Sequence, residues 1–195
     1  MSPEIEQFLS GMKKTIEEVV MPNLTDRFAQ EQAGIVAATL GFLGTIQDKV
    51  FHYELFENQE YKRILQDVLT ILDADAANAE AGTNETLGVV VEKVNKHFQH
   101  DNPADQTAFR PYLFIRGSNE NMKEFLCEFI QLQPEMPVQV RQDFEALLKP
   151  FFKSIEIRER SWVKGLGFDP AAEQQADIAD LLYENEYLRV ANINN

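Results

Sequence analysis

The 195-residue chain contains very few residues of the kinds that crosslink a protein or anchor it in a membrane. It has one cysteine, Cys127, which excludes an intrachain disulfide and suits a reducing compartment. No uninterrupted apolar run approaches the roughly 18 residues that a membrane-spanning helix needs. The first residues, Met1 to Glu6, lack the basic and apolar regions of a signal peptide. We therefore expect a cytoplasmic protein with no membrane partner.

Basic residues are also scarce. Lys and Arg number 18 against 32 Asp and Glu, which gives a formal net charge of -14. Because affinity for nucleic acid comes largely from cationic groups that displace counterions, this balance excludes nucleic acid as an expected partner. Apolar residues make up 44% of the chain, enough to bury a sizeable core. The bulk composition favours a single domain over residues 1–195, or one domain with a C-terminal extension at 165–195.

No alternating strand pattern longer than a few residues occurs in the sequence, whereas apolar residues recur repeatedly at helical spacing. The pattern predicts an all-α bundle of about seven helices. The expected helices cover approximately residues 3–20, 26–56, 61–82, 87–98, 118–130, 138–162 and 170–188.

Pro22 separates the first two predicted helices, which therefore form an N-terminal helical hairpin. The second helix has large apolar residues on one face and a stripe of small residues beside it. The small stripe comprises Ala29, Ala33, Ala37, Gly41 and Gly44. Small side chains let a second backbone approach closely, so this stripe predicts a close helix contact. The pattern leaves open whether the contact is with a second subunit or with neighbouring helices of the same chain.

Two segments depart from simple helical periodicity. Pro150 lies inside the sixth predicted helix, where it removes a backbone hydrogen bond and predicts a kink or a break near Lys149. Residues 99–117 read as a long loop whose apolar centre packs against the core, with Ser118 as the cap of the next helix. The role of this loop is left open.

His97 and His100, with the neighbouring Asp101, are the only candidate metal ligands. A spacing of three residues puts both imidazoles on one face of a helix. Histidine is also favoured at helix C-termini by the helix dipole, and a surface pair is the more common case. The Glu-x-x-His motif of di-iron bundles is absent from the sequence. We therefore expect no metal and no cofactor.

No catalytic residue is identified from the sequence. Cys127 lies within a helix that has an apolar face, without a glycine-rich loop or a helix N-terminus to activate it. We expect it to be partly buried and inert.

Arg158, Arg160 and Trp162 form a basic patch that includes an aromatic residue in an otherwise acidic chain. Guanidinium groups and an indole face suit a phosphate or carboxylate ligand. The alternative is structural: the arginines pair with Glu156, Glu159 or the acidic last helix, and Trp162 fills space in the core. The structural interpretation is favoured because acidic partners are abundant within the chain.

The N-terminal quarter of the chain resembles a known family. The residues that carry the resemblance are Phe8, Leu9, Glu17, Val20, Pro22, Leu24, Arg27, Ala33, Val36 and Leu40. They are similar to the N-terminal helices of a small bacterial all-helical family often encoded beside acyl-CoA dehydrogenases and aminoglycoside-phosphotransferase-like kinases. The resemblance implies a cytoplasmic accessory protein in acyl or small-molecule metabolism, and no particular activity.

These observations rank three hypotheses of function. The first is a non-catalytic interaction or assembly protein that self-associates as a homo-oligomer or binds a protein partner. The alternative is a binding module for an apolar or acyl small molecule. The third is an enzyme of unrecognised type.

Overall fold

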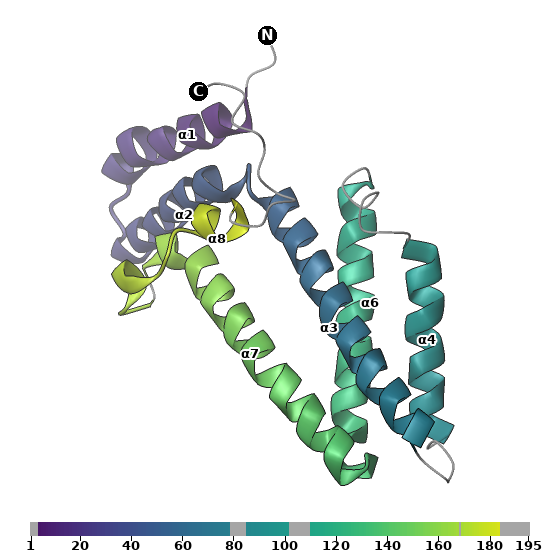
Figure 1. Cartoon of the computed structure of the whole chain (residues 1–195). Coiled ribbons are helices and arrows are strands. Elements are labelled where there is room, and N and C mark those ends of the chain that lie inside the picture. The colour runs from purple at the N-terminus through teal and green to yellow at the C-terminus, as the bar shows by residue number, and fades with distance from the viewer. Residues whose placement is uncertain (1–3, 79–84, 102–109, 168, 184–195) are drawn as a thin grey trace, which may run out of the picture. The chain divides into compact units, whose positions relative to one another are not determined.

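The computed structural model describes residues 4–78, 85–101, 110–167 and 169–183, and it confirms the all-α class. Its described part contains seven α-helices (Figure 1). They are α1 (Ile5–Thr15), α2 (Arg27–Ile46), α3 (Val50–Asn78), α4 (Glu85–Asp101), α6 (Tyr112–Leu132), α7 (Val138–Trp162) and α8 (Ile178–Tyr183). Among the described residues, no helix is both long and apolar enough to cross a membrane.

The chain divides into two compact units. The first comprises Met1–Val50 and Ile157–Asn195, and the second comprises Phe51–Glu156. One boundary falls at the start of α3 and the other inside α7. The expectation of a single domain over residues 1–195 stays a prediction.

The second unit contains the main hydrophobic core. Helices α3, α4, α6 and α7 each contribute apolar side chains at three- and four-residue spacing, so that one stripe of each helix is buried. The buried members are Tyr61, Ile64, Leu65, Val68, Leu87, Val90, Val94, Met122, Leu126, Phe129, Met136, Val140, Phe144, Leu148 and Phe151. The core is that of a helical bundle, as the periodicity predicts.

In the first unit, α1 and α2 form the predicted N-terminal hairpin, and Figure 1 shows them side by side. Asp26 caps α2, because its carboxylate accepts a hydrogen bond of 2.7 Å from the Ala29 backbone N–H. Gly41 of the small-residue stripe meets α1 of the same chain. A Cβ atom at Gly41 would lie 3.3 Å from Lys13 Nζ, and Ala37 is buried. At Gly41 the stripe therefore has a partner within the chain, whereas nothing lies within 4 Å of a Cβ atom at Gly44.

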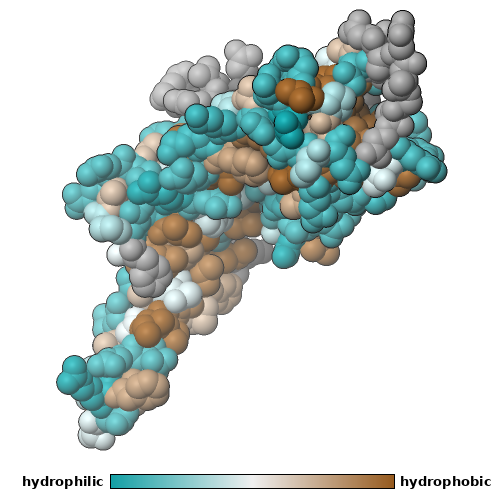
Figure 2. Space-filling view, turned by 90° about the horizontal axis from the view of Figure 1, so that it is seen from below, coloured by the Kyte–Doolittle hydropathy of each residue, from teal (hydrophilic) through white to brown (hydrophobic). Residues whose placement is uncertain are grey.

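The hairpin buries few side chains. Helix α1 has no buried residue, and α2 has only Ala37 and Ile46 among its described residues. Large apolar side chains of both helices are exposed instead. Figure 2 shows hydrophobic side chains, in brown, lying among hydrophilic ones on the face of the molecule seen from below.

The central helix is shorter than the sequence predicts. It ends at Ile46, and α3 begins at Val50, so the single helix expected over residues 26–56 is wrong. Side chains near the break bond to carbonyl groups at the end of α2. Thr45 Oγ1 donates to the Phe42 carbonyl at 2.7 Å, and Lys49 Nζ donates to the Thr45 carbonyl at 2.8 Å. These bonds satisfy carbonyl groups at a helix end and offer the backbone an alternative to continued helix.

The predicted loop at 99–117 is mostly helical where the structure describes it. Helix α4 continues to Asp101 and α6 begins at Tyr112, directly after Pro111, while residues 102–109 lie outside the described part. Proline is well suited to a helix start because it has no N–H to leave unpaired. Ile115 is buried as expected, but Leu113 is 74% exposed.

Ser118 and Pro150 both lie inside helices. Ser118 is in the second turn of α6, so its expected role as a helix cap is wrong. Helix α7 runs from Val138 to Trp162 with Pro150 in its interior, so the alternative of a break near Lys149 is also wrong. Pro150 has no N–H to donate within the helix, which nevertheless continues on both sides of it.

Candidate functional site

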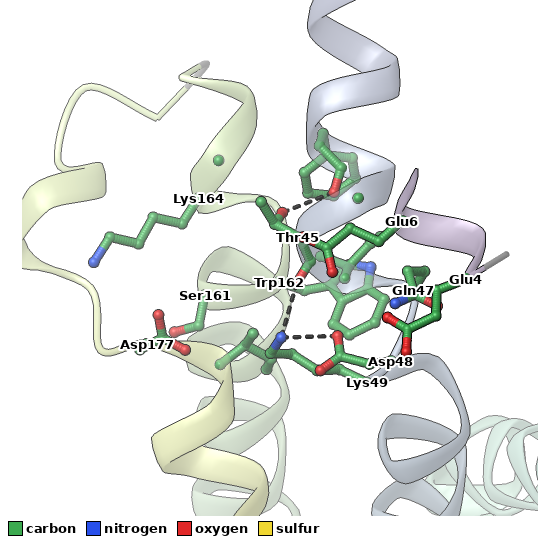
Figure 3. Close-up of a pocket in the computed structure, with 15 residues that line it drawn as sticks. Glu4, Glu6, Thr45, Gln47, Asp48, Lys49, Ser161, Trp162, Lys164 and Asp177 are labelled. Carbon is green, nitrogen blue, oxygen red and sulfur yellow. Dashed lines mark hydrogen bonds and ion pairs between the residues drawn. The ribbon is translucent and has the colours of Figure 1, made fainter. Parts of the chain in front are cut away.

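The first unit contains a cavity of about 780 Å³, shown in Figure 3. Its walls come from the start of α1, the end of α2 and the turn that follows it, the end of α7 and the start of α8. A volume of this size is in the range of small-molecule sites.

Apolar side chains form one part of the cavity wall. Trp162, Phe42 and Ile178 line it, and Figure 3 shows the Trp162 indole among the labelled side chains. Gly165 allows the Phe42 ring to lie close to the backbone, since a Cβ atom there would be 3.4 Å from a ring carbon. Trp162 is partly exposed.

Charged side chains form the other part of the wall. Four carboxylates line the cavity, from Glu4, Glu6, Asp48 and Asp177, together with the amines of two lysines, Lys49 and Lys164. Both amines already have partners within the protein. Lys49 Nζ lies 2.9 Å from Asp48 Oδ1, and Lys164 Nζ donates to the Gln175 carbonyl at 2.8 Å. Figure 3 shows the Lys164 side chain extending away from Trp162. The cavity is therefore acidic.

Ser161 contributes an unusual polar atom to the same wall. The residue is 3% exposed, and its hydroxyl oxygen has no hydrogen-bond partner among the residues that the structure describes. Buried hydroxyls are nearly always paired, because an unpaired one costs about 1–3 kcal/mol. The Ser161 hydroxyl is thus a buried polar group without a partner in the part of the chain that the structure describes.

The structure separates the three residues predicted as an anion site. Of Arg158, Arg160 and Trp162, only Trp162 lines the cavity. Arg160 makes two hydrogen bonds to Asp169, of 2.9 and 3.3 Å, which hold the pKa of that carboxyl below its ordinary value. Arg158 is buried at 2% exposure. Arg160 therefore pairs within the chain, as the structural interpretation expects.

A second polar cluster lies inside the second unit, centred on Asp101 at the end of α4. Asp101 is 2% exposed. Its Oδ2 atom lies 3.0 Å from Lys62 Nζ of α3 and accepts a 2.6 Å hydrogen bond from Ser118 Oγ of α6. The buried carboxylate is thus compensated by a cation and a hydroxyl from two other helices.

Ser118 connects this carboxylate to two further side chains. Its oxygen accepts a hydrogen bond of 3.1 Å from Asn58 Nδ2, and His97 Nε2 lies 3.0 Å away. Because the Ser118 hydroxyl donates its proton to Asp101, His97 Nε2 acts as the donor toward the Ser118 oxygen. Ser118 then donates one hydrogen bond and accepts two.

Asn119 extends the cluster along α6. It is fully buried, accepts a hydrogen bond of 2.9 Å from Asn58 and donates to the backbone carbonyl and the carboxylate of Glu54 at 2.9 and 2.8 Å. Tyr112 donates to the other Glu54 oxygen at 3.4 Å. The cluster therefore joins α3, α4 and α6 through buried polar groups.

The cluster contains serine, histidine and aspartate but does not have the geometry of a hydrolytic triad. In such a triad the carboxylate binds Nδ1 of the histidine, and Nε2 takes the serine proton. Here Asp101 accepts the Ser118 proton directly and lies 3.8 Å from Nε2 of His97. The arrangement serves to connect helices rather than to activate Ser118.

The candidate metal ligands are only partly brought together. His97 and Asp101 lie in the buried cluster, whereas His100 is exposed on α4. Within the described ranges, no group of three His, Cys, Asp or Glu residues is arranged to hold a metal ion. Cys127 is exposed on α6, so the expectation of partial burial is wrong.

Sequence reasoning missed Asn58, Lys62, Ser118 and Asn119. A signal was present, because each lies in register with the buried apolar stripe of its own helix. Asn58 and Leu65 are seven residues apart, and Ser118 precedes Met122 by four. Polar residues in core register predict a buried hydrogen-bonded cluster.

We expect protonation of His97 to weaken the folded state. Burial lowers the pKa of His97, and Lys62 and His100 lower it further, while Asp101 opposes them. The unfolded state, with a histidine pKa of about 6.5, then binds the proton more readily. Stability is therefore complete above about pH 6.5 and falls as the pH decreases toward the folded pKa. NMR titration of the His97 ring should give a midpoint below pH 6.5. A midpoint at or above pH 6.5 would contradict the lowering of the His97 pKa by burial.

Comparisons with protein-family models, curated proteins and solved structures find no match to this chain. The family resemblance of the N-terminal residues stays a prediction, and function is argued from the geometry alone.

Proposed function

We propose that this protein is a cytoplasmic, non-catalytic assembly protein that self-associates through the α1–α2 hairpin. The observation that carries the proposal is the exposure of nine large apolar side chains on these two helices and on the π-helical segment Ile16–Val20 between them. Each is between 40% and 67% exposed: Ile5, Phe8, Met12, Val19, Val20, Phe28, Ile35, Val36 and Leu43.

The exposed side chains form a stripe on each helix. On α2, Phe28, Ile35 and Leu43 recur at intervals of seven and eight residues, which gives a single stripe. On α1, Ile5, Phe8 and Met12 recur at intervals of three and four. We call these nine exposed side chains together the hairpin face.

The area of the hairpin face fits a protein interface. With ordinary side-chain areas, these exposures amount to roughly 900 Å², above the roughly 300–600 Å² of the largest apolar patch on a typical monomer. A standard interface buries about 800 Å² on each partner. One hairpin therefore offers enough surface for a stable contact with a second hairpin.

The charge distribution favours a second copy as the occupant. Helix α2 has only two charged residues, Arg27 and Glu31, and residues 32–47 have none, although the whole chain carries -14. The α2 parts of two hairpin faces can meet without opposing like charges. The rest of the chain is acidic and repels a second copy. Added salt screens this repulsion and should therefore strengthen association.

Ile35→Lys tests the interface. A charge placed in the centre of an apolar contact should weaken association at least about tenfold, because the ammonium group loses its water on binding. Analytical ultracentrifugation over a range of concentrations measures the effect.

Val138→Lys is the matched control. Val138 is 62% exposed and Ile35 is 59% exposed, but Val138 begins α7 and lies outside the hairpin face. It should associate like the wild type. A wild type that remains monomeric at all concentrations, or equal weakening by both substitutions, would refute the proposal.

A further inference from the structure

The solvent-exposed side of α2 presents an ordered pattern of apolar and polar side chains. At about 100° per residue, six exposed residues lie within about 50° of one line along the helix. They are Phe28, Gln32, Ile35, Val36, Thr39 and Leu43, which we call the outer stripe. Gly41, which meets Lys13 of α1, lies on the opposite side of the helix. The outer stripe is therefore turned away from α1.

The outer stripe is complementary to a second copy of itself. Turned end for end about its midpoint, the stripe exchanges Phe28 with Leu43 at its ends. The same rotation exchanges Gln32 with Thr39, and the two central apolar residues with each other. In a contact with two-fold symmetry, residue i of one copy meets residue j of the other, and j meets i. Two antiparallel α2 helices therefore match apolar with apolar and polar with polar positions along the whole stripe.

The two polar residues of the stripe can bond to each other across such a contact. Thr39 Oγ1 donates its proton to the Ile35 carbonyl at 2.8 Å, so the hydroxyl oxygen still accepts a hydrogen bond. The Gln32 amide supplies the N–H donor.

This polar pair selects one register. Moving the second copy by one helical turn places Gln32 or Thr39 opposite Ile35 or Val36, and an amide that loses its water there without a partner costs free energy. A polar residue in the seam between two helices specifies register in coiled coils for the same reason.

The attachment of the second unit favours the antiparallel orientation. A parallel pair also matches the stripe, with each Gln32 beside its own equivalent. However, α3 begins at Val50, so the second unit follows the C-terminal end of α2, and residues 51–156 carry more than half of the net charge of -14. A parallel pair attaches both acidic units at one end of the contact. An antiparallel pair attaches them at opposite ends of a 20-residue helix, about 30 Å apart, which exceeds the screening length of about 8 Å at physiological salt.

We propose, on the basis of the self-association proposed above, that two copies of this chain pair through antiparallel α2 helices. The two-fold axis passes between Ile35 and Val36, and Gln32 of each copy bonds to Thr39 of the other. Gln32 and Thr39 thus determine the register of the contact.

Disulfide crosslinking tests the register. The background is Cys127→Ser, because the native Cys127 is exposed and would form crosslinks of its own. Gln32→Cys and Thr39→Cys are mixed in equal amounts under mild oxidation, and intact mass spectrometry without reductant distinguishes the products. In the proposed pair, positions 32 and 39 face each other. Equivalent cysteines lie about 10 Å apart along the helices, beyond the roughly 7 Å between Cα atoms that a disulfide tolerates.

We expect the mixed disulfide to exceed either self-disulfide at least about fivefold, given this limit on disulfide geometry. Val138→Cys is the matched control. Val138 is 62% exposed but lies on α7, so a mixture of this variant with Gln32→Cys measures crosslinking by collision.

The outcomes separate this inference from the proposed function. Self-disulfides at both positions with little mixed product would indicate a parallel pair and overturn the inference. A mixed yield no higher than that with Val138→Cys, in a protein that self-associates, would also overturn it and leave the self-association standing. A wild type that stays monomeric in the ultracentrifuge would refute both proposals.

Discussion

Asp101→Ala is expected to lower the free energy of unfolding by about 3–5 kcal/mol, the usual cost of removing one partner of a buried ion pair. The substitution leaves the Lys62 ammonium, which is 10% exposed in its side chain, without its 3.0 Å partner. It also removes the acceptor of the Ser118 hydroxyl. Urea unfolding monitored by circular dichroism measures the loss.

Glu92→Ala is the control for this prediction, since Glu92 lies on the same helix and forms an ion pair with Lys96 at 2.6 Å. Both side chains of that pair are exposed, so solvent screens the interaction and the stability should hardly change. If the two alanine variants were equally stable, the buried cluster would not stabilise the bundle.

Phe129→Ala is expected to cost about 3–5 kcal/mol, because it empties a large site in the core. Phe129 is fully buried on α6, among the apolar stripes of the second unit. The same urea titration measures the change, and the slope of the transition should stay constant if the substitution affects only the folded state.

Phe152→Ala is the matched variant for this site. Phe152 is 45% exposed on α7 and contacts the Phe151 ring with 5.5 Å between ring centroids. It should lose less than half as much stability as Phe129→Ala. Equal losses would mean that the packing of Phe129 is wrongly assigned.

The all-α class and most helix positions could be predicted from the sequence because helix faces are a local property. Val90 and Val94 lie on one stripe whatever packs against them. The hairpin was predictable for the same reason, since Pro22 lies between the two helices and Asp26 is a strong cap for the second.

The polar cluster around Asp101 was not predicted, although its residue types were visible. Ser118 can cap a helix or bond to another helix, and the choice depends on what is near its hydroxyl. Only the packing of α4 against α6 brings Asp101 within 2.6 Å. Contacts between residues far apart in the chain are set by tertiary structure, and local pattern does not determine them.

The sequence by itself determined the helical class, the hairpin and the acidic, cysteine-poor composition. Tertiary structure alone decided that Gly41 meets Lys13 of α1, that Arg160 binds Asp169, and that Trp162 lines a cavity. The physical reason is that periodicity is a local property of the chain, whereas these contacts join residues that are far apart in the sequence. Periodicity records which side of a helix avoids water, but not which helix covers that side, nor whether the covering leaves space for a ligand.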